Sequence, residues 1–379
     1  MPDHQIEEAI ILMNAFARRT GLSSNRTPQR YLWTDAFAVC NYLGLAGATG
    51  EQEYLALAVR LADQVHHVLG RYREDDPRQG WISGLSDAEG EAHPVIGGLR
   101  IGKPLPERAV DEPFDERLEW ERDGQYFHYL TKWMHALDQL GRATGDFRYA
   151  GWACELAVTA HKAFSRHPGM VWKMSTDLKR ILVPSMGQHD PLDGYLTALQ
   201  LQATASDFGR MGDHKNLEAA IRDYRQMTDK TDLVTADPLG IGGLLVDAWR
   251  VVQLMVRGVN VDSRLLERLL VAAHQGLTFY AVEGELTAPA EFRLAFRELG
   301  LAIGLLGIKQ LEQIDTVIVP ENRLKPLTRF ISLSEQIISF WRDPMHQRVA
   351  SWRDHRDINE VMLATSLLPA GFLGTMQSS

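Results

Sequence analysis

Apolar residues recur at helical spacing along nearly the whole sequence, and no run alternates convincingly between apolar and polar residues as a strand would. The helices that this pattern predicts come in pairs. In each pair the first helix is rich in Gly, Ala and Leu, and the second carries more charge. Paired helices that bury a face only against their neighbours are typical of repeat architecture. We therefore expect an all-α chain of helical hairpins.

The spacing predicts five complete hairpins, a sixth first helix without a partner after it, and one more helix at the start of the chain. The turn Ala-Thr-Gly joins the members of the first two hairpins, at 48–50 and 143–145. The starting helix could supply the missing partner and close a ring. The expected hairpins are Trp33–Gly47 with Glu51–Arg73, Gln125–Arg142 with Phe147–Phe164, Leu192–Met211 with Lys215–Met227, Leu239–Arg257 with Ser263–Tyr280, and Phe292–Gln310 with Pro326–Trp341; the single helices are Asn359–Gly371 and Gln5–Arg19.

The connections differ in length in a regular way. Short turns follow the first helix of each pair, and long connections precede the next pair. In a ring of parallel first helices, this arrangement brings all the long connections to one face, at the N-termini of those helices. A chain of 379 residues suggests two or three domains by length alone. Because the repeats would close into one array, we expect a single domain, 1–379, with function on the face that carries the long connections.

Charge and composition exclude some classes of protein. The formal net charge is −9 and no Lys/Arg-rich run is present, which argues against a nucleic-acid partner. Cys40 and Cys154 are too few for a disulfide framework or a four-ligand zinc site. The start of the chain is acidic where a signal peptide is basic, and the apolar stretches Leu299–Ile308 and Val361–Met376 fall short of the ~20 residues of a membrane span. We expect a cytoplasmic protein with no membrane partner, no metal and no cofactor.

The long connections are rich in Trp, His, Asp, Glu and Arg. The densest of them contains Gln188-His189-Asp190-Pro191-Leu192-Asp193, and the last one contains the polar stretch 352–360. Apolar faces of sugar rings stack on aromatic side chains, and sugar hydroxyls take hydrogen bonds from Asp, Asn, His and Arg. This mixture of residues indicates a carbohydrate or polyol-like ligand.

The repeat pattern and the placement of the loops, over nearly the whole chain, resemble the six-hairpin glycosidase-like superfamily, the (α/α)6 barrels. No catalytic motif matches one family within it. The superfamily contains glycoside hydrolases, unsaturated-uronyl hydrolases, sugar epimerases and polysaccharide lyases. The resemblance implies a pocket at the loop-bearing mouth of the barrel and a carbohydrate-like ligand, without deciding the reaction.

A glycoside hydrolase is the first hypothesis, with one carboxyl group as acid and another as base or nucleophile. We expect the pair among Asp190 and Asp123, ahead of Asp35 and Glu291, with His189 in the same catalytic set. Asp35 follows Thr34, which can cap its helix and leave Asp35 free to point into the pocket. Each Asp also has a structural interpretation, as a helix cap or a partner of the helix dipole. The expected substrate-binding residues are Trp33, Tyr126, His128, Trp172, Lys173, Asp193, Arg353, His355, Asp357 and Asn359.

Two alternatives remain open. In a sugar epimerase, isomerase or lyase, His189, His355 and His128 would move protons, and Lys173 or Arg353 would stabilise an enediolate. A non-enzymatic carbohydrate-binding protein would have aromatic side chains at the mouth without paired titratable groups.

Two further patterns have ordinary structural explanations. Asp237 is expected to cap the helix that follows it. The glycines of 240–243 follow no strand, so we expect them to allow close helix packing and not to bind phosphate.

Overall fold

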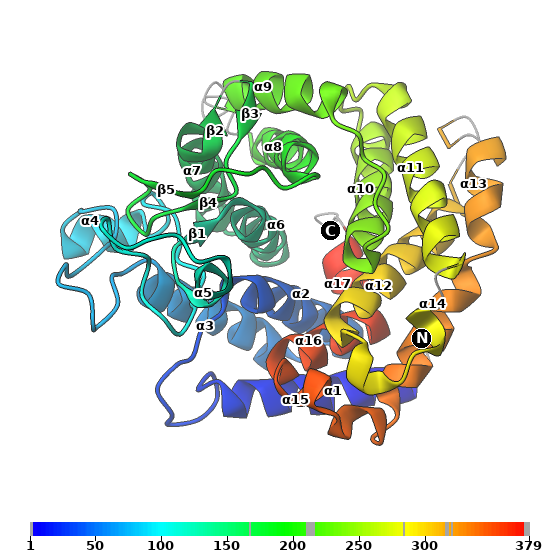
Figure 1. Ribbon diagram of the computed structural model, residues 1–379, viewed down its shortest axis with the longest axis horizontal. Helices are drawn as coiled ribbons and strands as arrows, with labels where there is room; N and C mark the ends of the chain where they lie inside the picture. The colour runs from blue at the N-terminus through cyan, green and yellow to red at the C-terminus, as the bar shows by residue number, and fades with distance from the viewer. Residues whose placement is uncertain are drawn as a thin grey trace. The chain divides into compact units, whose positions relative to one another are not determined.

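The computed structural model describes residues 3–166, 168–209, 217–282, 285–314, 318–319 and 321–374. Helices account for most of these residues (Figure 1). They are α1 (Asp3–Arg19), α2 (Leu32–Thr49), α3 (Gln52–Leu69), α4 (Asp87–Ala92), α5 (Glu116–Glu121), α6 (Phe127–Thr144), α7 (Phe147–Phe164), α8 (Asp190–Asp207), α9 (Leu217–Lys230), α10 (Pro238–Val256), α11 (Ser263–Val282), α12 (Ala295–Leu311), α13 (Glu321–Thr328), α14 (Ile331–Arg342), α15 (Ala350–Arg353), α16 (Arg356–Leu367) and α17 (Ala370–Leu373).

The described residues form two compact units. The first unit takes its residues from Met1–Phe16, Gly44–Gly50 and Asp232–Thr375, and the second takes them from Ala17–Leu43 and Glu51–Thr231. The single domain expected from the repeats stays a prediction.

The predicted helical pairs are present in both units. In the second unit α6 packs on α7 and α8 on α9; in the first, α10 packs on α11 and α12 on α14. The second helix of the fifth predicted pair, Pro326–Trp341, is interrupted. The structure has two helices there, α13 and α14, separated at Arg329 and Phe330. The unpaired helix predicted near the end of the chain, Asn359–Gly371, ends early, at Leu367. A proline disfavours helical backbone at the residue before it, and here Pro369 acts on Leu368. Met211 and Lys215, two predicted helix ends, lie outside the described residues.

The start of α8 differs from the prediction in a way that bears on function. The helix begins at Asp190 and not at Leu192, with His189 at the N-cap and Pro191 in the first turn. Proline suits this position because its fixed φ is helical and its missing N–H would have no partner there. Asp190 and Asp193 therefore both lie within the first turn of the helix.

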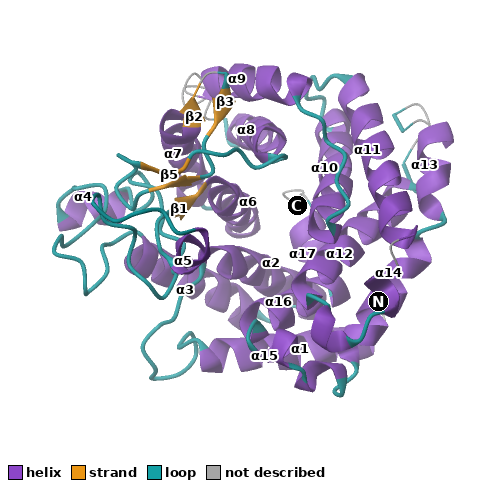
Figure 2. Cartoon of the chain, viewed as in Figure 1, coloured by secondary structure: helices purple, strands orange, loops and turns teal. Residues whose placement is uncertain are grey.

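Short strands lie in the long connections of the second unit, where the sequence predicted none. The strands β1 (Gln125–Tyr126), β4 (Lys173–Met174) and β5 (Ile181–Val183) form an antiparallel sheet in that order, and β2 (Ser165–Arg166) pairs with β3 (Gly169–Met170). Two or three residues are too few for an alternating pattern to be detected. In Figure 2 these strands and the long loops gather beside α6 and α7.

Close helix packing in the first unit explains the glycines at 240–243 in part. A Cβ on Gly242 of α10 would lie 2.3 Å from the carbonyl oxygen of Gly300 in α12, and one on Gly304 would lie 2.5 Å from the carbonyl oxygen of Gly242. Only glycine permits this approach. The Asp237 carboxylate accepts a hydrogen bond from the Gly240 N–H at 3.0 Å, so the predicted cap is confirmed.

Two features of the first unit complete the fold. Helix α1 is tied to α14 by an ion pair between Glu8 and Arg342 at 2.5 Å. By length and composition α10 is the one helix among the described residues that could cross a membrane, and 61% of its 18-residue apolar window is buried inside the protein, as in an ordinary core helix.

Candidate functional site

The N-terminal ends of α2, α6 and α8 lie together in the second unit. The hydroxyl of Tyr31, directly before α2, is 2.6 Å from that of Tyr129 in the first turn of α6. One turn further along α6, Thr131 and Lys132 each donate a hydrogen bond of 2.6 Å to Oδ2 of Asp193 at the start of α8. The loop-bearing ends of these three helices therefore meet, as the sequence predicted for this part of the chain.

Asp190 and Asp193 are one helical turn apart, so both carboxyl groups lie on the same face of α8. Asp190 is 5% exposed, and its Oδ2 accepts a hydrogen bond of 3.2 Å from the Gly187 N–H. Burial and the neighbouring charge of Asp193 raise the pKa of Asp190 to about 7. Its protonated form is therefore populated near neutral pH.

Asp193 has a different environment on the same face. The ammonium of Lys132 and the hydroxyl of Thr131 both point at its Oδ2, and both favour the ionised carboxylate. The two neighbouring carboxyl groups therefore have different environments. Gly187 helps to seat the first of them, because a Cβ there would lie 2.5 Å from Oδ2 of Asp190.

Aromatic rings cover the start of α6. Tyr126 lies 4.9 Å from Trp172 and 5.3 Å from His128 between ring centroids, and the His128 and Trp172 rings are nearly parallel, at 5.9 Å and 9°. Pairing of Tyr126 in β1 with Lys173 in β4 brings Trp172 to this position. The three predicted binding residues therefore form one aromatic cluster next to the first turn of α6.

His128 is neutral in this cluster. Burial, followed by the charge of Lys132, lowers its pKa to about 4. Its Nδ1 is buried without a hydrogen-bond partner. Burying an N–H without an acceptor costs more than burying a lone pair, so we expect the remaining proton on Nε2. In that tautomer His128 can donate a hydrogen bond to an uncharged acceptor.

Asp123, expected in the catalytic pair, is held as a structural ion. It is fully buried, and its carboxylate receives the Arg100 guanidinium at 2.6 Å and the backbone N–H of Gly102 at 3.0 Å. Arg73 lies 3.8 Å away. These donors hold the Asp123 carboxylate in place and fix the loop before α6. We therefore do not retain it in the catalytic pair.

Asp35 and Lys173 are also used by the protein itself. The Asp35 carboxylate is not free to point into a pocket, because it pairs with buried Arg30 at 3.3 Å and accepts the Tyr31 N–H at 2.9 Å. The Lys173 ammonium is fully buried and donates to a side-chain oxygen of Glu119 at 3.0 Å and to two backbone carbonyls. Both side chains are therefore committed to contacts within the protein.

The remaining candidate site residues are divided between the two units. In the second unit, Trp33 is buried against Phe37 at 4.4 Å, and His189 is the half-buried N-cap of α8. In the first unit, Glu291 lies exposed in a single 3-10 turn, Arg353 and His355 are exposed, Asp357 is half-buried, and Asn359 is fully buried, with its side-chain amide donating to the Trp352 carbonyl at 3.0 Å.

Sequence reasoning missed Thr131, Lys132, Tyr31 and Tyr129. Thr131 and Lys132 follow His128 by three and four residues, so they share its side of α6. That spacing is a usable signal, although a Thr-Lys pair on a helix is too common to be selected without the structure.

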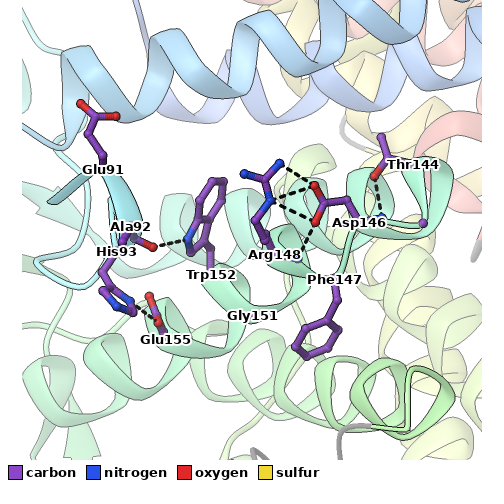
Figure 3. A pocket seen from close by; sticks show the side chains of 11 residues that line it. Glu91, Ala92, His93, Thr144, Asp146, Phe147, Arg148, Gly151, Trp152 and Glu155 are labelled. Atoms are coloured by element: carbon purple, nitrogen blue, oxygen red, sulfur yellow. Dashed lines mark hydrogen bonds and ion pairs between the residues drawn. The ribbon is translucent and has the colours of Figure 1, made fainter. Parts of the chain in front are cut away.

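A separate groove of about 880 Å³ runs along α7 in the second unit (Figure 3). Its polar groups pair with one another: His93 with Glu155 at 2.6 Å, and Arg148 with Asp146 at 2.7 Å. The Trp152 indole N–H donates to the Ala92 carbonyl at 2.8 Å. None of the predicted site residues lines this groove.

Within the described part of the chain, no three His, Cys, Asp or Glu side chains come together as a metal site requires.

Comparison with known proteins gives the fold. No family model matches the chain, and no curated protein sequence does. Among solved structures, a GH76 alpha-mannanase from Bacteroides thetaiotaomicron is similar with a TM-score of 0.53 and 9% identity, covering 97% of this chain and 95% of its own. A sugar epimerase from a ruminal bacterium matches with a TM-score of 0.41 and 12% identity, over 79% of this chain and 75% of its own. The likeness to the mannanase confirms the predicted fold class, all-α with the hairpins of an (α/α)6 barrel.

Proposed function

We propose that this protein is a carbohydrate-active enzyme, and that it is a glycoside hydrolase with its catalytic carboxyl groups at the start of α8. The observation that carries the proposal is the contrast within one helical turn. Asp190 is buried with a pKa raised to about 7, while Asp193 receives a lysine and a threonine. Paired carboxyl groups with opposed environments are the requirement for acid–base cleavage of a glycosidic bond.

In this mechanism Asp190 is the general acid. It transfers its proton to the glycosidic oxygen as the bond from that oxygen to the anomeric carbon breaks. Asp193 either takes a proton from the water that attacks the anomeric carbon or attacks that carbon itself, giving a covalent intermediate that water then hydrolyses. In both cases one water is consumed and a hemiacetal and an alcohol are produced.

The surroundings of the pair suit a sugar. Trp172, which is half-buried beside the start of α6 and is backed by the buried Tyr126, offers an apolar ring face on which a sugar ring can stack. His128 would orient a sugar oxygen from Nε2. The activity of the GH76 alpha-mannanase with the same fold supports testing mannosides first.

A proton-transfer enzyme, such as an epimerase or isomerase, is the second candidate. The observation that favours it is His128, whose imidazole lies among the aromatic rings near Asp193. A base with its pKa lowered to about 4 is weak at neutral pH, so this candidate ranks below hydrolysis. Exchange of solvent deuterium into the sugar, without cleavage of an oligosaccharide, would identify it.

The test combines ligand search and substitution. Wild-type protein is screened by thermal shift and by release of reducing sugar against mannosides, glucosides and uronic-acid oligosaccharides. Asp190→Asn should lower kcat on the substrate found by roughly 100- to 10,000-fold, because the proton donor is lost.

Asp207→Asn is the matched control, since Asp207 lies at the opposite end of α8 and is half-exposed. It should keep wild-type kcat. Equal activity of Asp190→Asn and Asp207→Asn would exclude Asp190 as the acid.

A further inference from the structure

Trp120 of α5 is a large aromatic side chain that is 46% exposed. Its ring lies 4.9 Å from that of Trp172, edge to face at 74°. Trp172 in turn lies parallel to His128 in the first turn of α6. An aromatic strip therefore leads from an exposed tryptophan to the helix whose Thr131 and Lys132 contact Asp193.

The backbone on both sides of Trp120 is fixed by buried charge. The Lys173 ammonium donates to the carbonyl oxygens of Glu119 at 2.7 Å and of Arg122 at 2.8 Å, one residue before and two residues after Trp120. It also pairs with the Glu119 carboxylate. Burying an ammonium costs free energy unless it is fully hydrogen-bonded, and here all its bonds go to the segment that presents Trp120.

Arg108 strengthens the same support. Its guanidinium donates to the Glu119 carboxylate at 2.9 Å and to the Leu182 carbonyl of β5 at 3.0 Å. The Leu105 N–H donates to the Glu121 carbonyl at 3.2 Å. These contacts join α5 to the sheet that also positions Trp172. Trp120 is thus exposed on a rigid support and not on a loose loop.

We propose that Trp120, supported by its edge-to-face contact with Trp172, forms a second sugar-ring subsite, so that the ligand is an oligosaccharide of at least two units and not a monosaccharide. This inference rests on the proposed function. A rigid, exposed indole offers stacking area at low entropy cost, which suits one face of a pyranose. The strip from Trp120 to His128 continues the catalytic site outward, which is where the next unit of a bound chain would lie.

Other apolar side chains of the same loop are exposed, among them Val110, Phe114 and Leu118. Phe114 is 56% exposed and faces the Arg108 guanidinium at 5.7 Å. No ring contact joins these three side chains to the Trp120–Trp172 pair among the described contacts. Phe114 therefore serves as a control for a general apolar surface on this loop.

The test compares chain lengths by calorimetric titration with mannose and mannotriose, glucose and cellotriose, and galacturonate and its trimer, in protein that carries Asp190→Asn so that the trimer is not cleaved during the titration. Protein with Trp120 intact should bind the trimer of its preferred sugar roughly tenfold more tightly than the monomer, the gain of one stacked ring. Trp120→Ala should lose that roughly tenfold gain and keep the monomer affinity. Trp120→Phe should keep part of the gain, and Phe114→Ala should keep all of it.

The outcomes separate the two proposals. If wild-type protein binds no saccharide, the proposed function and the subsite both fail. If it binds saccharides and Trp120→Ala keeps the preference for trimers, only the subsite fails. The subsite also fails if Trp120→Ala weakens monomer and trimer equally, or if Phe114→Ala has the same effect as Trp120→Ala.

Discussion

The loop before α6 and the start of α8 each bury an aspartate, and the two aspartates are in opposite environments. Asp123 is fully buried and receives a guanidinium and two backbone N–H groups. Asp190 is 5% exposed, accepts one backbone N–H, and has a second carboxylate as its neighbour. The first environment favours the charge and the second opposes it.

This difference distinguishes an aspartate that stabilises the fold from one that can take part in a reaction. A buried carboxylate surrounded by donors stabilises a loop. A buried carboxyl group without a cation of its own holds its proton to higher pH and can act as an acid. Residue type and burial alone therefore do not identify a catalytic aspartate, whereas the balance of donors around it does.

The largest effect on stability is expected at Asp123. Asp123→Ala leaves the Arg100 guanidinium buried without its partner, which should cost about 3–5 kcal/mol in the free energy of unfolding. Glu267→Ala is the control, because both members of its ion pair, with Arg323, are half-exposed. It should cost at most about 1 kcal/mol. Urea denaturation measures the free energy of unfolding of both variants. Similar losses of this free energy would mean that Asp123 is not a structural ion.

A smaller effect, on the pH dependence of activity, is expected from Lys132, the cation beside the carboxyl pair of α8. Its ammonium contacts Asp193 at 2.6 Å and lowers the pKa of Asp190. A positive charge favours an ionised carboxylate, so its removal lets Asp190 hold its proton to higher pH. In Lys132→Met the basic limb of the pH–rate profile, which reports loss of the Asp190 proton, should move upward by about one pH unit.

The control for this shift is Lys179→Met. Lys179 is 80% exposed and its nearest carboxylate is that of Asp177, at 3.6 Å. Its removal should leave the profile in place. A downward shift in Lys132→Met, or the same shift in both variants, would contradict the role given to Lys132.

The sequence predicts the helical frame well. Each hairpin is encoded by apolar spacing within its own helices, and so α7 is predicted with its observed bounds, Phe147–Phe164. The prediction fails where local signals are weak. The strands β1 and β4 are two residues long, and α5 has six residues in an acidic loop. These elements exist because of distant partners, such as Lys173 for α5.

The candidate site is predicted only in part. Residue type and position pointed to Asp190, Asp193, His128 and Trp172, which lie at the starts of α6 and α8 or beside them. They could not distinguish Asp190 from Asp123, because the distinction depends on Arg100, which is 23 residues before Asp123 in the chain. Ion pairs over such separations leave no periodic pattern in a sequence.

The most direct test of this account is a carboxyl ¹³C NMR titration of protein labelled at aspartate, with Asp190→Asn used to assign the Asp190 signal. The account predicts that the signal missing in Asp190→Asn titrates in wild-type protein with a pKa of about 7. A pKa near or below the ordinary value of 3.8 would contradict it, since Asp190 would then be ionised at neutral pH and could not donate the proton.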